Sequence, residues 1–138
     1  MKCRALALSG GGTNGAWEAG VIWGLQNYGN PEDYAWNVVT GVSAGSMGAA
    51  GMAGFGLDEG KEAAQMLSDT WSHQLNKDVW TLWEGKGLIR GCLTEKGCLN
   101  DAPMLDQLQE ITSHYSEIKR NFTINAANVE TGEYEVFN

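Results

Sequence analysis

The chain has 138 residues, of which 43% are hydrophobic and 19% are charged, with only 2 prolines. This composition excludes a disordered or collagen-like protein and indicates a globular chain long enough for one core. Nine Lys and Arg against 17 Asp and Glu give a formal net charge of -8, which is the wrong sign for capturing nucleic acid or anionic lipid by charge. We therefore expect no nucleic-acid partner, and we expect any contact with a membrane surface to be transient and mainly apolar.

The first predicted element is a short buried strand at residues 4–9, which leads into the glycine-rich loop GGGTNG at residues 10–15. Consecutive glycines allow backbone N–H groups to converge on one point, and the amino end of a following helix adds partial positive charge there. The loop is therefore predicted to bind an anion. Gly10, Gly12 and Gly15 also fit the G-x-G-x-x-G pattern of dinucleotide-binding units, so the loop suits either a pyrophosphate or a developing oxyanion.

Residues 15–29 are predicted to form the helix that follows this loop. Within it, Ala16, Gly20 and Gly24 recur at every fourth position. Side chains at this spacing lie on one face of a helix. We expect this stripe of small residues to press closely against a sheet.

A second strand, predicted at residues 37–42, leads directly into Gly41-Val42-Ser43-Ala44-Gly45, which fits the pattern G-x-S-x-G. A helix made almost wholly of Ala, Gly and Met follows at residues 44–55, and its lack of a polar face predicts that it is buried. A serine between a strand and a helix is typical of a nucleophile elbow, in which a strained turn exposes the hydroxyl and the two glycines leave room for neighbouring backbone. Ser43 is therefore the candidate nucleophile.

The rest of the chain is expected to alternate helices and strands. Helices are predicted at residues 58–74, at 76–83 and from about 101 onward, a glycine-rich loop at 85–97, and strands at 121–129 and 134–137. This order predicts an α/β fold with a mainly parallel sheet. Because the sequence ends on a strand, we expect the domain to be incomplete.

With these motifs the sequence resembles the patatin-like phospholipases. The resemblance rests on residues 6–16 and 40–46, and more loosely on residues 97–105 and the strand near Phe122. It implies a three-layer α/β sandwich, truncated at its C-terminal end, in which residues 1–138 form a single acyl hydrolase domain. It also implies a serine esterase that cleaves lipid ester bonds through an acyl-enzyme, with no metal and no cofactor.

The resemblance also assigns roles to individual residues. Ser43 corresponds to the nucleophile of a Ser–Asp dyad, flanked by Gly41 and Gly45 of the elbow, and the oxyanion hole corresponds to Gly10, Gly11 and Gly12. Asn14 stands where the family usually has Arg or Lys, which removes a positive charge beside the loop. The family's catalytic Asp lies in an Asp-Gly motif, and residues 1–138 contain no Asp-Gly. The resemblance therefore implies that the base lies beyond residue 138.

Three alternatives remain open at this stage. One is a Ser–His–Asp triad of Ser43, Asp106 and His114, although a histidine inside a regular helix argues against it, and His73 is a weaker candidate. Another is a nucleotide-binding module on residues 10–15, although the acidic residue expected at the end of the second strand is missing there. The last is a catalytically inactive fragment that binds lipid.

Two features of the second half bear on environment and location. The apolar residues around Trp80, Leu82 and Trp83 suit either a lipid-touching lid or, as we prefer, the core. Cys92 and Cys98 are close enough to pair in an oxidising compartment, but reduced thiols are the expectation for so few cysteines. Without a visible signal peptide or membrane span, the sequence favours a cytoplasmic or peripheral membrane location.

Overall fold

The structure of the protein, a computed structural model, describes residues 3–113 and 115–138. It contains two compact units. Among the described residues, the sheet unit comprises residues 3–72 and 115–138, and the middle unit comprises residues 73–113.

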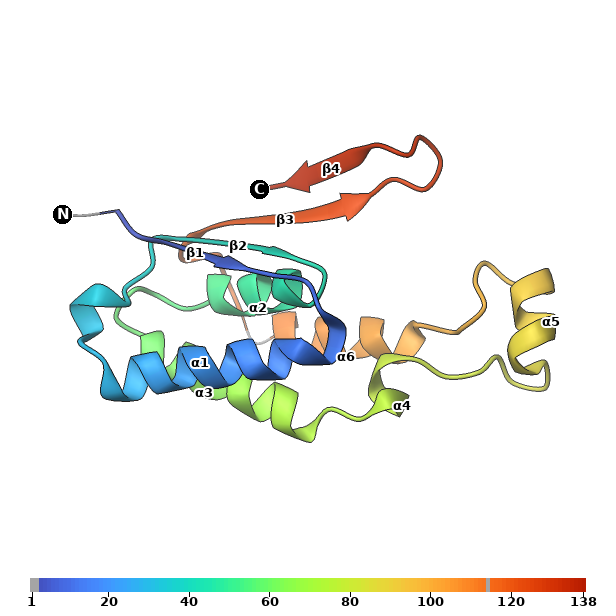
Figure 1. Ribbon diagram of the computed structural model, residues 1–138, viewed down its shortest axis with the longest axis horizontal. Helices are drawn as coiled ribbons and strands as arrows, with labels where there is room; N and C mark the ends of the chain where they lie inside the picture. The colour runs from blue at the N-terminus through green and yellow to red at the C-terminus, as the bar shows by residue number, and fades with distance from the viewer. Residues whose placement is uncertain (1–2, 114) are drawn as a thin grey trace. The chain divides into compact units, whose positions relative to one another are not determined.

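A four-stranded sheet with the order β1-β2-β3-β4 organises the sheet unit (Figure 1). Its strands are β1 (Ala5–Leu8), β2 (Val38–Val42), β3 (Asn121–Ala127) and β4 (Tyr134–Phe137). The first three strands are parallel, and β4 returns antiparallel to β3. The predicted α/β fold with a mainly parallel sheet is confirmed.

The helices of the sheet unit are α1 (Gly15–Tyr28), α2 (Ala44–Ala53) and α3 (Gly60–His73), with short 3-10 turns η1 (Gly12–Asn14) and η2 (Pro31–Asp33). Figure 1 shows α1, α2 and α3 on the same side of the sheet. This follows from the strand order, because successive right-handed crossovers that move in one direction along a sheet place their helices on one face. The described residues of the sheet unit therefore form a sheet with a helical layer on this face.

The hydrophobic core lies between the sheet and these helices. Its largest fully buried side chains are Val39 of β2 and Met52 of α2. Seven of the ten residues of α2 are buried, namely Ala44, Gly45, Gly48, Ala49, Gly51, Met52 and Ala53. Small side chains allow α2 to approach β1, β2 and β3 closely. The predicted burial of this helix is confirmed.

The predicted packing face of α1 is wrong. Gly20 is exposed, and no atom lies within 4 Å of the place where a Cβ would stand at Gly20 or Gly24. The buried residues are instead Gly15, Ala19, Ile22 and Gln26. The ring of Trp71 occupies the space beside Gly15 that a side chain would need. Because α1 is apolar on most sides, its tertiary partner and not the spacing of its small residues determines which face is buried.

A buried arginine connects segments that are distant in sequence. Arg120, which is 6% exposed, donates from Nε to the carbonyl of Phe55 at 2.8 Å and from one Nη to the carbonyl of Gly56 at 2.7 Å. A longer bond of 3.4 Å reaches the carbonyl of Trp36. Burial lowers the pKa of this guanidinium, and the carbonyl acceptors offset part of the cost of desolvating it.

The middle unit contains α4 (Asn76–Val79), α5 (Gly87–Thr94) and α6 (Ala102–Ser113). The prediction of a loop at residues 85–97 is wrong for the residues of α5. Glycines there suggest a loop, but Gly91 is helical and its missing side chain leaves room for the indole of Trp83. The helix near residue 101 is confirmed, and the carboxamide of Asn100 accepts a bond from the N–H of Ala102 at 3.1 Å.

Cys92 and Cys98 form a disulfide, contrary to the expectation of reduced thiols. Cys3 is a free, exposed cysteine.

The interpretation of the segment around Trp80, Leu82 and Trp83 as core is wrong for two of its side chains, because Trp80 is 40% exposed and Leu82 is 52% exposed. Only Trp83 is partly buried, and its indole N–H donates to the carbonyl of Gly97 at 2.9 Å. Within the described ranges, no helix combines the length and apolarity needed to cross a bilayer.

Candidate active site

The glycine-rich loop and the G-x-S-x-G turn lie at the same edge of the sheet. β1 and β2 are adjacent parallel strands, and Leu8 pairs with Gly41 in their register. The segments that follow these two strands therefore both leave the sheet at its carboxyl edge. Ligands of open α/β sheets bind outside this edge.

Ser43 adopts a conformation that few residues other than glycine adopt. Its φ is 56° and its ψ is -123°, and no other non-glycine among the described residues has a positive φ. Such a conformation costs about 1–3 kcal/mol and is concentrated at functional sites. The residue is exposed, and its hydroxyl neither caps α2 nor bonds to another residue in the described part of the chain. The hydroxyl is therefore accessible to an incoming molecule.

The two glycines of the motif are required by close backbone contacts. A Cβ at Gly41 would overlap the carbonyl group of Gly45, and a Cβ at Gly45 would lie 2.5 Å from the carbonyl oxygen of Leu8. Ser46 braces the turn from both sides, because its N–H donates to the carbonyl of Ser43 at 2.9 Å and its hydroxyl donates to that of Gly41 at 2.8 Å. The tight turn thus depends on the residue types that the motif prescribes.

The glycine-rich loop begins directly beside the serine. A Cβ at Gly10 would lie 3.1 Å from the Cβ of Ser43, so the two residues are in contact range. Gly12 has a φ of 57°, which favours glycine, and the space beside it is open. Gly10, Gly11 and Gly12 are all exposed. The structure therefore brings together the two motifs that the sequence separates by about 30 residues.

Asn14 contacts Gly11 of the glycine-rich loop. Its N–H donates to the carbonyl of Gly11 at 3.1 Å, and its Cβ would be 3.1 Å from a Cβ placed at Gly11. Asn14 and Ser43 are the N-cap residues of α1 and α2, and neither makes a side-chain capping bond. Both helices direct the positive ends of their dipoles to this edge, which favours negative charge there. An anionic oxygen would be stabilised at this edge.

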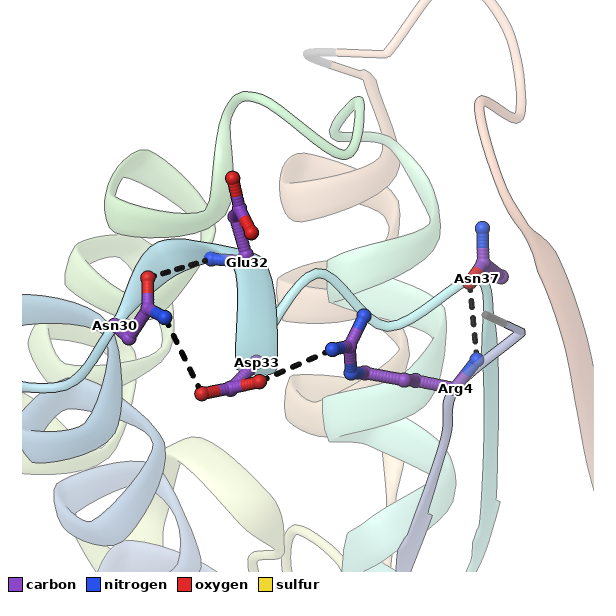
Figure 2. Close-up of polar contacts among 5 residues, drawn as sticks. All are labelled: Arg4, Asn30, Glu32, Asp33 and Asn37. Carbon is purple, nitrogen blue, oxygen red and sulfur yellow. Dashed lines mark hydrogen bonds and ion pairs between the residues drawn. The ribbon is translucent and has the colours of Figure 1, made fainter. Parts of the chain in front are cut away.

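The acidic residues of η2 lie at the other edge of the sheet, near the amino ends of β1 and β2, as Figure 2 shows. Asp33 forms an ion pair with Arg4 at 3.0 Å, and the N–H of Arg4 donates to the carboxamide of Asn37 at 3.0 Å. Arg4 and Asn37 immediately precede β1 and β2, so this cluster is at the amino edge of the sheet. Asp33 is therefore in the wrong place to bind the ribose of a dinucleotide held by residues 10–15.

The sequence offers Asp106, His114 and, more weakly, His73 as partners of Ser43 in a catalytic triad. Asp106 is an exposed residue of α6, His73 is exposed at the end of α3, and His114 lies outside the described residues. Across residues 3–113 and 115–138, no group of three or more His, Cys, Asp or Glu side chains is arranged to hold a metal ion.

The sequence interpretation missed two residues that support the turn. One is Ser46, which follows the motif directly and could have been noticed from its position alone. The other is Asn125 of β3, whose amide Nδ2 donates to the carbonyl of Gly41 at 3.2 Å. Asn125 pairs with Val42 across two parallel strands, and this pairing could not be read from the sequence.

A family model described as patatin-like phospholipase matches residues 6–130. The chain belongs to the patatin-like phospholipase family. The matched residues include the glycine-rich loop, the G-x-S-x-G turn and all of β3, so the resemblance noted from the two motifs is confirmed. Searches of curated proteins and of solved structures gave no significant match. Membership in this family supports a relation to lipid hydrolases.

Proposed function

We propose that this patatin-like protein is a serine acyl hydrolase that cleaves ester bonds of phospholipids or other acyl lipids through an acyl-enzyme on Ser43. The observation that carries the proposal is the placement of Ser43. Its exposed hydroxyl stands on a strained turn, in contact range of Gly10 and at the amino end of α2.

In the proposed reaction, the Ser43 hydroxyl oxygen attacks the ester carbonyl carbon, and the carbonyl oxygen becomes an oxyanion. Backbone N–H groups of Gly10, Gly11 and Gly12 stabilise this charge, because preorganised donors in such a site lower the barrier more than solvent does. The carbon–oxygen bond to the alcohol then breaks, and the alcohol leaves with the proton taken from Ser43. Water attacks the acyl-enzyme, which releases the fatty acid and restores the hydroxyl.

The proton transfer needs a base. The family pattern assigns it to the Asp of an Asp-Gly motif, which residues 1–138 do not contain. In the proposed reaction this base takes the proton from Ser43 and delivers it to the leaving alcohol. Asn14 supplies a neutral amide where the family usually has a cation, so oxyanion stabilisation would depend on backbone donors.

In this proposal the protein contacts its lipid substrate through apolar side chains and not through charge. The formal charge of -8 opposes electrostatic attraction to anionic lipid. The middle unit exposes three large aliphatic side chains on α5, of which Leu88 is 52%, Ile89 78% and Leu93 80% exposed. Apolar side chains of this kind could contact the interface of a lipid aggregate transiently.

A fluorophosphonate probe tests the proposal, because it reacts covalently with activated serines. We expect labelling of the chain, complete loss of labelling in Ser43→Ala, and no change in Ser116→Ala, which alters another exposed serine. Circular dichroism should show that all three proteins are folded. Labelling that persists in Ser43→Ala would refute Ser43 as the nucleophile.

A catalytically inactive lipid-binding protein is the second candidate. The observation that favours it is that residues 1–138 lack the Asp-Gly motif in which the family pattern places the base. In that case folded protein should co-sediment with phosphatidylcholine vesicles and remain unlabelled. Labelling of Ser43 would exclude this candidate.

A further inference from the structure

A carboxylate on α1 holds the residue that precedes the glycine-rich loop. Glu18 lies in the first turn of α1, and its Oε1 accepts two hydrogen bonds from Ser9, one from the N–H and one from the hydroxyl, each at 2.8 Å. Ser9 connects the end of β1 to Gly10.

The other side of Ser9 lies against the start of α2. A Cβ at Gly45 would be 2.7 Å from the carbonyl oxygen of Ser9, so no side chain fits between them. The next residue, Gly10, is in contact range of Ser43. The backbone at Ser9 is therefore confined by Glu18 of α1 on one side and by the first turn of α2 on the other.

We propose that Glu18 is a positioning residue that sets the distance between the Gly10–Gly12 backbone and the Ser43 hydroxyl. This inference rests on the proposed function. The carboxylate does not touch the substrate in this role. It fixes the direction in which the chain leaves β1, and thereby the place where the loop's N–H groups meet the oxyanion. A displacement of about 1 Å in such a site costs about 100-fold in rate.

An alternative is that Glu18 only stabilises α1, and this role would depend on a different property of the side chain. A negative charge in the first turn stabilises a helix by about 0.3–1 kcal/mol through the helix dipole. That role needs the charge but not the length of Glu18. Positioning needs an acceptor that reaches both Ser9 groups, but it does not need the charge.

Two conservative variants separate these roles. Glu18→Gln keeps the length and an acceptor oxygen but loses the charge, whereas Glu18→Asp keeps the charge but is one methylene too short for both bonds. The matched control is Glu62→Gln, because Glu62 is the exposed acidic residue in the first turn of α3.

The experiment measures fluorophosphonate labelling of Ser43 in the full chain, resolved into the maximal rate of inactivation and the probe concentration at half-maximal rate. We expect the maximal rate to fall about tenfold in Glu18→Asp and to stay within about threefold in Glu18→Gln. The half-maximal concentration and the control should be unchanged. Equal rates in the parent and Glu18→Asp, or a greater loss in Glu18→Gln than in Glu18→Asp, would overturn the positioning role while leaving the proposed function intact.

A second measurement does not depend on reactivity. Hydrogen–deuterium exchange at residues 9–12 should be faster in Glu18→Asp than in the parent, with β2 and α3 unchanged. Unchanged exchange at residues 9–12 would also overturn the proposal. If the folded parent is not labelled at all, the proposed function fails and the role of Glu18 fails with it, which is a different outcome from loss in Glu18→Asp alone.

Discussion

The sheet unit and the middle unit are stabilised in different ways. All of the buried hydrophobic residues that form the core belong to residues 8–67, within the sheet unit. In the middle unit, Gly91 is the one buried residue in the part that the structure describes. The middle unit instead has the Cys92–Cys98 disulfide, an ion pair between Lys86 and Glu95, and backbone hydrogen bonds that pair Thr81 with Asn100.

This difference indicates where precise geometry is maintained. The two motifs of the candidate site both lie in the sheet unit, on strands and helices whose positions are set by close packing. Segments with few buried apolar contacts open at lower free energy than segments of the core. The middle unit is therefore expected to fluctuate more easily, while the turn at Ser43 is held in its strained conformation by the surrounding core.

The largest expected effect comes from breaking the packing of the sheet unit at its turn. Gly41→Ala would place a Cβ on the carbonyl group of Gly45, so we expect the free energy of unfolding to fall by about 4 kcal/mol or more. Urea denaturation followed by tryptophan fluorescence measures this loss.

The matched control is Gly20→Ala, at an exposed helical position with open space around the missing side chain. It should stabilise the protein by about 0.5–1 kcal/mol, because alanine favours the helix. A Gly41→Ala variant as stable as the parent would contradict the close contact between β2 and α2.

The next effect sharpens the contrast between the units. Replacing Cys92 and Cys98 with serine removes a short covalent loop, which on the chain-entropy account stabilises by about 2 kcal/mol. We expect faster hydrogen–deuterium exchange in α5 and no change in β1, β2 and α2. Replacing the unpaired Cys3 with serine is the control and should change neither unit. Equal loss of protection in both units would show that they unfold together.

The sequence predicts the sheet unit well where a residue type has one structural reason to be present. The glycines of the G-x-S-x-G motif are needed by backbone contacts within that short segment and with Leu8, so the turn and its flanking strand and helix could be predicted. The buried small-residue helix α2 follows in the same way from its composition. In the middle unit, by contrast, Gly91 suggests a loop and proves to be a packing position for Trp83 in a helix.

The remaining features depend on tertiary partners. Arg120 binds the carbonyl of Gly56 across 64 residues, and nothing near it in the sequence identifies that acceptor. Asn125 reaches the turn only because β3 pairs with β2 in one register. The contact between Glu18 and Ser9 is closer in sequence, but it depends on the path of the chain between a strand and a helix. Such bonds could not be predicted without the fold.

The smallest expected effect concerns the surface of the sheet unit. Glu59 accepts a backbone bond from Gly56 and an ion-pair bond from Lys119 at 2.9 Å. These two bonds, with the backbone bond first, lower the pKa of Glu59 below its ordinary value of 4.5, and the bond to Glu59 raises the pKa of Lys119 above its ordinary value of 10.5.

The two shifts predict where stability depends on pH. A lowered carboxyl pKa contributes stability that is present above pH 4.5 and is lost as the pH falls through the folded-state pKa. A raised amine pKa contributes stability that is present below pH 10.5 and is lost as the pH rises through the folded-state pKa.

Glu59→Gln keeps an acceptor for Gly56 but removes the charge, so it should flatten both limbs of the urea midpoint plotted against pH. Glu62→Gln should leave both limbs as they are. Because both partners are partly exposed to water, the change should be far smaller than that caused by Gly41→Ala, so a large loss in Glu59→Gln would contradict the conclusion that the core stabilises the sheet unit.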